Sequence, residues 1–196
     1  MVKERDRQSS EEKLINAVGE LIEEIGFENL GINQVAKRAG FSKNLIYRYF
    51  DSLDGLIYAY LKKHDFWANA INEKVDTSDI KAYLKAFYRR EIAEFRGNTA
   101  LKRLRRWELS TTKDFVIEIR ALREKNGVQF LNMMTQFVKI DKGQLQAISA
   151  LIDAGIAYLA IFEDSCKMYN GIDIQSSEGW QQISKGIDTL IDFMIR

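Results

Sequence analysis

The sequence predicts an all-α protein, and three observations support that fold class. The 196 residues include no proline, so no position forces a helix to break. Apolar residues recur at three- and four-residue intervals over most of the chain, and the 12 glycines stand mostly where these patterns stop. We expect an N-terminal helical domain over residues 1–63 and a larger C-terminal helical domain over residues 64–196, with about nine helices in all.

The first two helices are predicted from their end signals. Ser9 and Glu12 have the spacing of a capping box, so we expect the first helix to begin there. Its apolar pattern runs until Gly26. Residues 32–39 predict a short second helix, which Gly40 ends.

Two further helices complete residues 1–63. Ser42 is expected to cap a third helix that buries Ile46 and Phe50. Ser52 is expected to cap a fourth, which carries an apolar stripe as far as Leu61. The helices of the C-terminal domain are longer and are predicted over residues 78–96, 99–109, 114–138, 144–169 and 178–195.

The composition limits the possible locations and functions. Basic and acidic residues nearly balance, 29 against 28, so any attraction to nucleic acid must be local. The single cysteine fits a reducing compartment, and the charged first ten residues do not read as a signal peptide. The longest apolar run, residues 154–162, is shorter than the roughly 20 residues of a membrane span. We expect a cytoplasmic protein that does not enter the membrane.

The segment "KRAGFSKNLIYRYF", residues 37–50, predicts a helix-turn-helix. Its two short helices are joined by a three-residue turn that contains a glycine, and such a motif places its second helix in the major groove of DNA. Between residues 34 and 50 there are four basic residues and no acidic one. Ser42 and the free N–H groups at the start of the helix could hold a phosphate, while Lys43, Asn44 and Arg48 could reach phosphates or base edges. The alternative is that these basic residues form an ordinary solvated helix face and bind no DNA.

The run "GFENLGINQVAKRAGFSKNLIYRYFDSLDGLIYAYL", residues 26–61, resembles the DNA-binding region of the tetracycline-repressor (TetR) family of bacterial transcriptional regulators. The resemblance rests on "VAKRAGFS", on "IYRYF" and on the leucine that heads the next helix. It implies an all-helical homodimer that binds a palindromic operator and releases it when a small molecule enters the C-terminal domain. It also implies that Lys43, Asn44, Tyr47 and Tyr49 contact DNA while Ile46 and Phe50 face the core.

Two positions depart from the family pattern. Gly31 stands where the family often has a threonine or serine that contacts phosphate, and Leu53 stands where a lysine often binds the backbone. Glycine can still cap a helix, so only the hydroxyl contact is in question. The complete set of candidate DNA-binding residues is Gly31, Asn33, Ser42, Lys43, Asn44, Tyr47, Arg48 and Tyr49.

The C-terminal domain lacks the usual signs of an enzyme. It has no HExxH, GxSxG or phosphate-binding glycine loop, and the chain has one histidine and one cysteine. We therefore predict no catalytic residue, no metal and no cofactor. A site built of carboxylates alone stays open, as does a second function class: a helical small-molecule-binding protein or enzyme whose N-terminal module is not used for DNA.

Two sets of residues in the C-terminal domain are candidates for other sites. Aromatic residues and methionines could line a pocket for a hydrophobic or aromatic effector, although each alone could equally be core. That set is Trp67, Phe87, Tyr88, Phe95, Trp107, Phe115, Phe130, Met134 and Phe137. Small and apolar residues on the last two helices predict a four-helix dimer interface, with packing inside one chain as the alternative. That set is Ala150, Ala154, Ala157, Tyr158, Ile161, Ile187, Leu190 and Ile191.

Overall fold

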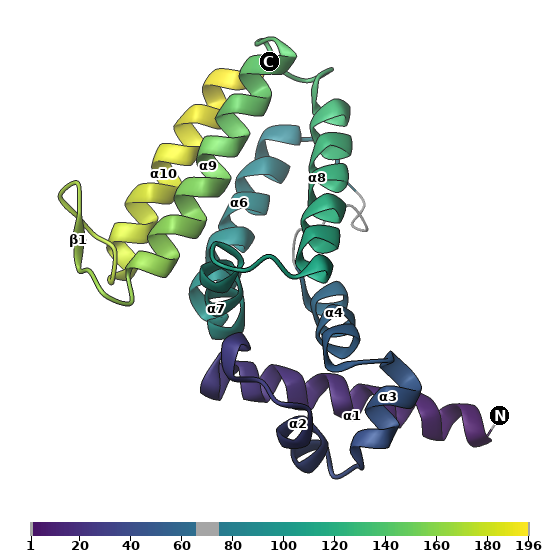
Figure 1. The fold of residues 1–196 in the computed structure, drawn as a ribbon. Helices are drawn as coiled ribbons and strands as arrows, with labels where there is room; N and C mark the ends of the chain where they lie inside the picture. The colour runs from purple at the N-terminus through teal and green to yellow at the C-terminus, as the bar shows by residue number, and fades with distance from the viewer. Residues whose placement is uncertain (1, 66–74, 196) are drawn as a thin grey trace. The chain divides into compact units, whose positions relative to one another are not determined.

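In a computed structural model, which describes residues 2–65 and 75–195, the chain is helical as predicted (Figure 1). It forms two compact units. The first consists of Met1–Asn69 with Thr99–Arg123, and the second of Ala70–Asn98 with Glu124–Arg196. The helices are α1 (Val2–Ile25), α2 (Ile32–Ala39), α3 (Lys43–Phe50), α4 (Leu53–His64), α6 (Ile80–Gly97), α7 (Thr99–Glu108), α8 (Asp114–Met134), α9 (Lys142–Phe162) and α10 (Ser177–Met194), with a 3-10 turn at Phe27–Asn29.

In the first unit α1 packs against α2, α4 and α7, and α3 packs against α2 and α4. Leu14, Val18 and Ile22 of α1 are fully buried, as is Leu56 of α4. Gly26 follows the last residue of α1 with a φ of 80°, as its position in the sequence predicts. The predicted start of α1 is wrong, however. The helix begins at Val2, so Ser9 lies inside it and does not cap it, and the neighbouring Ser10 hydroxyl donates to the carbonyl of Asp6.

The division of the chain also differs from the predicted boundary at residue 63. Helix α7 and the first half of α8 belong to the first unit, because the Trp107 ring stacks on Phe27 at 5.1 Å and Arg103 Nη1 donates to the carbonyl of Ile22 at 3.0 Å. The basic residues around Arg103 are thus partly buried. The predicted functional division stays a proposal. It assigns residues 1–63 to DNA binding and residues 64–196 to effector binding and dimerisation.

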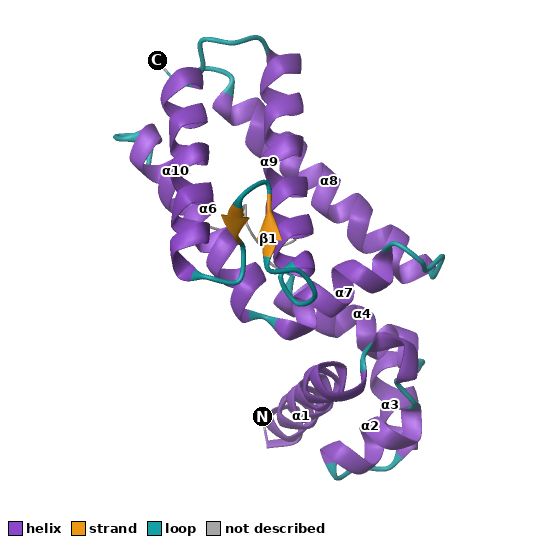
Figure 2. Ribbon diagram, turned by 90° about the vertical axis from the view of Figure 1, so that its left-hand side faces the viewer, coloured by secondary structure: helices purple, strands orange, loops and turns teal. Residues whose placement is uncertain are grey.

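In the second unit α6 packs against α9 and α10. Helices α9 and α10 run antiparallel to each other (Figure 1), and the Lys139 N–H donates to the Met194 carbonyl at 2.8 Å, just before the start of α9 and at the end of α10. The predicted helix over residues 144–169 ends early, at Phe162. A short antiparallel hairpin follows it, with β1 (Met168–Tyr169) paired to β2 (Ile172–Asp173) (Figure 2).

Helix α9 is also long and apolar enough to cross a membrane by length and composition alone. Its most apolar 18-residue window has a mean hydropathy of 1.8, and 28% of that window is buried inside the chain. The sequence prediction missed this property because it considered only the uninterrupted run of residues 154–162. Passing this test is weak evidence for membrane insertion, since core helices of soluble proteins pass it too.

Candidate DNA-binding surface

The turn between α2 and α3 is built on Gly40. Gly40 has φ 75° and ψ 25°, in the left-handed region where side chains other than glycine are strained. Its N–H donates to the Lys37 carbonyl at 3.3 Å, and the Phe41 N–H donates to the Ala36 carbonyl at 2.9 Å. This pair of bonds is a Schellman motif, which satisfies the last carbonyls of α2 and turns the chain into α3.

Helix α3 has one buried side and one exposed side. Ile46 is fully buried and Phe50 is half-buried. The opposite side carries four exposed residues at positions that repeat each helical turn, namely Lys43, Asn44, Tyr47 and Arg48. Tyr47 has 48% of its surface exposed and is therefore accessible to a partner. The arrangement presents two cations, an amide and a phenol on one helix face.

Ser42 occupies the N-cap position of α3, as predicted, but it makes no capping bond with its side chain. It is exposed, as are Asn33 and the neighbouring Lys43, while Gly31 is half-buried. Gly31 is the N-cap of α2 as predicted, and its N–H donates to Gln34 Oε1 at 2.8 Å. Gly31 provides no side-chain hydroxyl at the start of α2, and the Gln34 side chain accepts the hydrogen bond from its N–H instead.

One of the four basic residues in the predicted DNA-binding segment is paired within the chain. The Arg38 guanidinium donates to both carboxylate oxygens of Glu24, at 2.8 and 2.7 Å, and to Glu20 at 3.2 Å. These bonds raise the pKa of Arg38, chiefly through Glu24. Arg38 therefore holds α2 against α1, and the charge available to a partner is smaller than the count of basic residues indicates.

The junction between α3 and α4 is closely packed. Asp51 takes a positive φ of 63°, and the Ser52 hydroxyl accepts from the Gly55 N–H at 2.9 Å, so Ser52 caps α4 as predicted. A Cβ added at Gly55 would lie 2.1 Å from the Phe50 carbonyl oxygen, so only glycine fits at this position in the first turn of α4. Leu53, the departure noted in the sequence, is the first residue of α4 and is half-buried.

Comparison with known families decides the identity of this region. Residues 14–60 match the family model of the TetR-family bacterial regulatory proteins, which covers the helix-turn-helix and α4. Residues 14–60 thus match the DNA-binding region of TetR-family proteins. That family consists of bacterial regulatory proteins rather than enzymes.

Solved structures share the fold over nearly the whole chain. A TetR transcription regulator from Haloarcula marismortui is 18% identical with a TM-score of 0.73, covering 96% of this chain and 100% of its own. NalD, the secondary repressor of the MexAB-OprM multidrug efflux pump in Pseudomonas aeruginosa, is 14% identical with a TM-score of 0.68, covering 97% and 98%. FadR, a fatty acid degradation regulator from Bacillus halodurans, is 17% identical with a TM-score of 0.65, covering 92% and 96%. No curated protein matches the chain.

The residues predicted to line one effector pocket fall into two aromatic clusters. In the first unit the Trp107 ring stacks on Phe27 and lies 5.9 Å from Phe115. In the second unit the Phe87 ring lies 5.4 Å from both Tyr88 and Phe130. Phe95, Met134 and Phe137 belong to the second unit, where the first two are buried and the third is half-buried. Trp67 lies outside the described residues.

Polar groups accompany the second cluster, and the sequence prediction missed them. Tyr88 is buried in α6, and burial raises the pKa of its hydroxyl, as do the charges of Asp153 and Glu91. The tyrosine is therefore neutral at physiological pH. It bonds to Ser149 of α9, which is 7% exposed, and Glu91 is 1% exposed. Polar groups buried beside aromatic rings are typical of a small-molecule site.

The predicted dimer residues separate into exposed and buried ones. Ala150, Ala154, Tyr158 and Leu190 are exposed, and Ala157 and Ile161 are half-buried. Ile187 and Ile191 are 7% and 0% exposed, because α10 turns them inward within its own chain. They pack in the core of the second unit.

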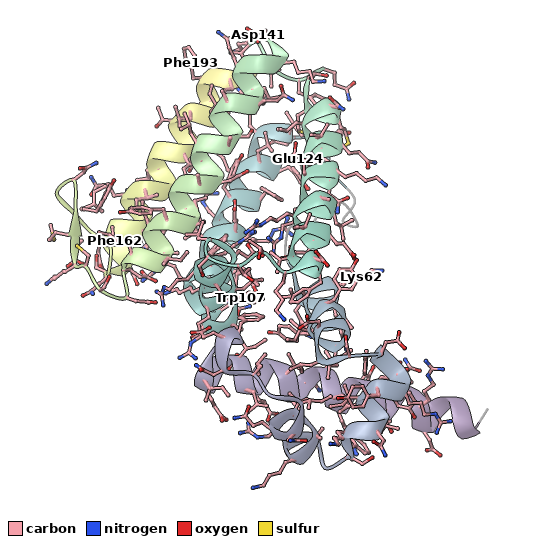
Figure 3. The ribbon with its side chains drawn as sticks, viewed as in Figure 1. Lys62, Trp107, Glu124, Asp141, Phe162 and Phe193 are labelled. Atoms are coloured by element: carbon pink, nitrogen blue, oxygen red, sulfur yellow. The ribbon has the colours of Figure 1, made fainter. Side chains whose placement is uncertain are left out.

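Two large apolar residues beside this set were not predicted. Leu151 on α9 is 74% exposed, and Phe193 on α10 is 73% exposed and lies toward the Asp141 end of α9 (Figure 3). With Tyr158 and Leu190 they are the large apolar side chains exposed on α9 and α10, a set called here the α9–α10 face.

A buried ion cluster joins three parts of the first unit. Arg123 of α8 donates from Nε to Asp65, the C-cap of α4, at 2.8 Å, and from Nη1 to Glu108 of α7 at 2.7 and 3.0 Å. Their side chains are only 9%, 0% and 6% exposed. Burial would lower the pKa of Arg123, but the bonds to Asp65 and Glu108 outweigh it and raise the pKa. No local pattern indicates the cluster, since Asp65 and Arg123 are 58 residues apart.

Proposed function

We propose that this protein is a ligand-responsive transcriptional regulator that acts as a repressor. It binds a palindromic operator as a homodimer and releases it when a small hydrophobic or aromatic effector binds. The observation that carries the proposal is the exposed face of α3, with Lys43, Asn44, Tyr47 and Arg48 on a helix anchored by the buried Ile46. Asparagine pairs well with adenine, and arginine or lysine with guanine.

The recognition helix supplies two kinds of contact. Lys43 and Asn44 lie at the start of α3, the part of a recognition helix that reaches base edges. The Tyr47 hydroxyl donates to a phosphate, which positions the helix without reading sequence. Because the chain is nearly neutral overall, with 29 basic and 28 acidic residues, binding depends on these contacts rather than on a general positive field.

The homodimer forms through the α9–α10 face. Its exposed apolar side chains are covered when two copies meet, and a twofold axis places the same face on both sides. Two recognition helices then meet DNA about one helical turn apart, near 34 Å, which is the origin of the palindrome. The protein works in the cytoplasm, and α9 packs with its partner rather than in a membrane.

The effector site involves the aromatic cluster of Phe87, Tyr88 and Phe130 in the second unit. Apolar rings take up a hydrophobic ligand, and the buried polar groups around Tyr88 select its polar group. The ligand can change the affinity for the operator only as far as it binds one conformational state of the protein, DNA-binding or released, more tightly than the other. A coupling of about 1–3 kcal/mol gives a change of about 5- to 150-fold.

DNA binding is tested by selection from a randomised duplex library with the purified protein, followed by titration of the recovered duplex. We expect Lys43→Ala to weaken binding about 10-fold or more, and Tyr47→Phe about 5-fold because it removes one hydroxyl contact per subunit. Lys142→Ala, an exposed lysine at the start of α9, removes the same charge and serves as the matched control. Failure to recover any duplex would favour the second function class, a helical protein that binds small molecules without using DNA.

A further inference from the structure

Helix α1 extends well beyond the core of the domain that it belongs to. Its buried apolar residues begin at Leu14, and the described residues before that point, 6–13, are exposed or half-buried. The family match also begins at residue 14. The 12 residues from Val2 to Lys13 form about three helical turns, roughly 18 Å of helix, and none of the described side chains there, residues 6–13, is buried.

Arg7 in this extension contacts the recognition helix. The Arg7 guanidinium carbon lies 5.2 Å from the centre of the Tyr49 ring, and that of Arg48 lies 6.0 Å from the same ring. Tyr49 is half-buried at the edge of α3 and also packs edge-on against Phe50. One aromatic ring therefore brings a cation from α1 next to a cation of the exposed α3 face.

The geometry leaves the bonding edge of Arg7 available. Stacking on a ring uses the flat face of a guanidinium, whereas its N–H groups point outward in the plane. Nε donates to Glu11 at 2.7 Å, the two terminal nitrogens make no hydrogen bond to a described residue, and the side chain is 59% exposed. A planar fork of N–H donors that is held in place matches the oxygens of a phosphate.

From these contacts we infer that Arg7 is a DNA-backbone contact, which binds a phosphate flanking the bases read by α3 and is positioned by the Tyr49 ring. The inference rests on the proposed function, because it needs α3 to lie in the groove. Arg7 contributes affinity and not sequence preference, since phosphate contacts carry no sequence information directly. Glu11 opposes this contact, because its carboxylate lies beside Arg7 and repels the phosphate.

The test uses the duplex recovered by selection and a scrambled duplex of the same length, titrated at several KCl concentrations. We expect Arg7→Ala to weaken binding to both duplexes about equally, by roughly 10-fold. The slope of log affinity against log salt should fall by about one per subunit. Glu11→Gln should strengthen binding to both duplexes. Melting curves of the variants confirm that α1 still folds.

The outcomes separate this inference from the proposed function. If the unaltered protein recovers a duplex and Arg7→Ala leaves the affinity and the salt slope unchanged, Arg7 does not contact DNA and the proposed function stands. A loss confined to the selected duplex would also overturn the inference, because Arg7 would then be reading bases. If Lys43→Ala and Tyr47→Phe have no effect either, the recognition-helix assignment itself is wrong.

Discussion

Replacing Arg123 with methionine should lower the free energy of unfolding by about 3–5 kcal/mol. The guanidinium lies between Asp65 and Glu108, whose side chains are 0% and 6% exposed, and its removal takes a buried cation from both carboxylates, although Glu108 keeps the bond from Arg105 at 3.1 Å. Methionine fills much of the same volume, so the lower stability comes from the missing positive charge rather than from a cavity. The measurement is urea unfolding followed by circular dichroism.

The surface pair of Arg89 and Asp188 provides the matched control. It has the same chemistry, but the side chains are 53% and 21% exposed, so Arg89→Met should cost less than about 1 kcal/mol. Adding Asp65→Asn to Arg123→Met should recover part of the loss, because one of the buried negative charges is removed. Equal effects of the two single replacements would mean that the Arg123 cluster is no more important than an exposed ion pair.

Because the cluster joins the end of α4 to α7 and α8, Arg123→Met should also affect DNA binding under conditions where the protein stays folded. Helix α4 packs directly against the recognition helix α3 and against α1. A looser α4 leaves α3 less well oriented, and the affinity for the selected duplex falls. The Arg89→Met protein is again the reference for this titration.

A single charge on the α9–α10 face should dissociate the proposed dimer. Leu151 is 74% exposed in the isolated chain, so Leu151→Glu costs little in a monomer. In a symmetric dimer the change buries a carboxylate in each subunit, and we expect the dissociation constant to rise on the order of 100-fold or more. Sedimentation at micromolar concentration measures the change, because the subunit mass is 22.7 kDa and a dimer has twice that mass.

Leu109 offers a control of the same residue type and greater exposure. It is 86% exposed just after α7, in the first unit, and Leu109→Glu should leave the association unchanged. A wild-type protein that sediments as a monomer would contradict the dimer, and a dimer that tolerates Leu151→Glu would place the interface elsewhere. DNA affinity should fall with Leu151→Glu as well, because one recognition helix alone makes half of the contacts.

The sequence by itself determined the fold class and most of the N-terminal domain. Gly26 and Gly40 end their helices, and Ser52 caps α4, because these preferences arise from the backbone of the residue itself and from neighbours a few positions away. The exposed side of α3 follows in the same way from helical periodicity. The Ser9 signal was misleading because a capping box is only a local option, and α1 continues through it to Val2.

Only the tertiary structure decided which of these residues remain available to a partner. Arg38 adds to the positive charge of the helix-turn-helix segment in the sequence, yet Glu24 of the preceding helix binds it, while Arg7 meets the recognition helix from far along the chain. Likewise, α10 turns Ile191 inward and leaves Phe193 exposed. Periodicity identifies the faces of a helix, but which face another element covers depends on contacts between residues distant in sequence, and these form only when the helices pack.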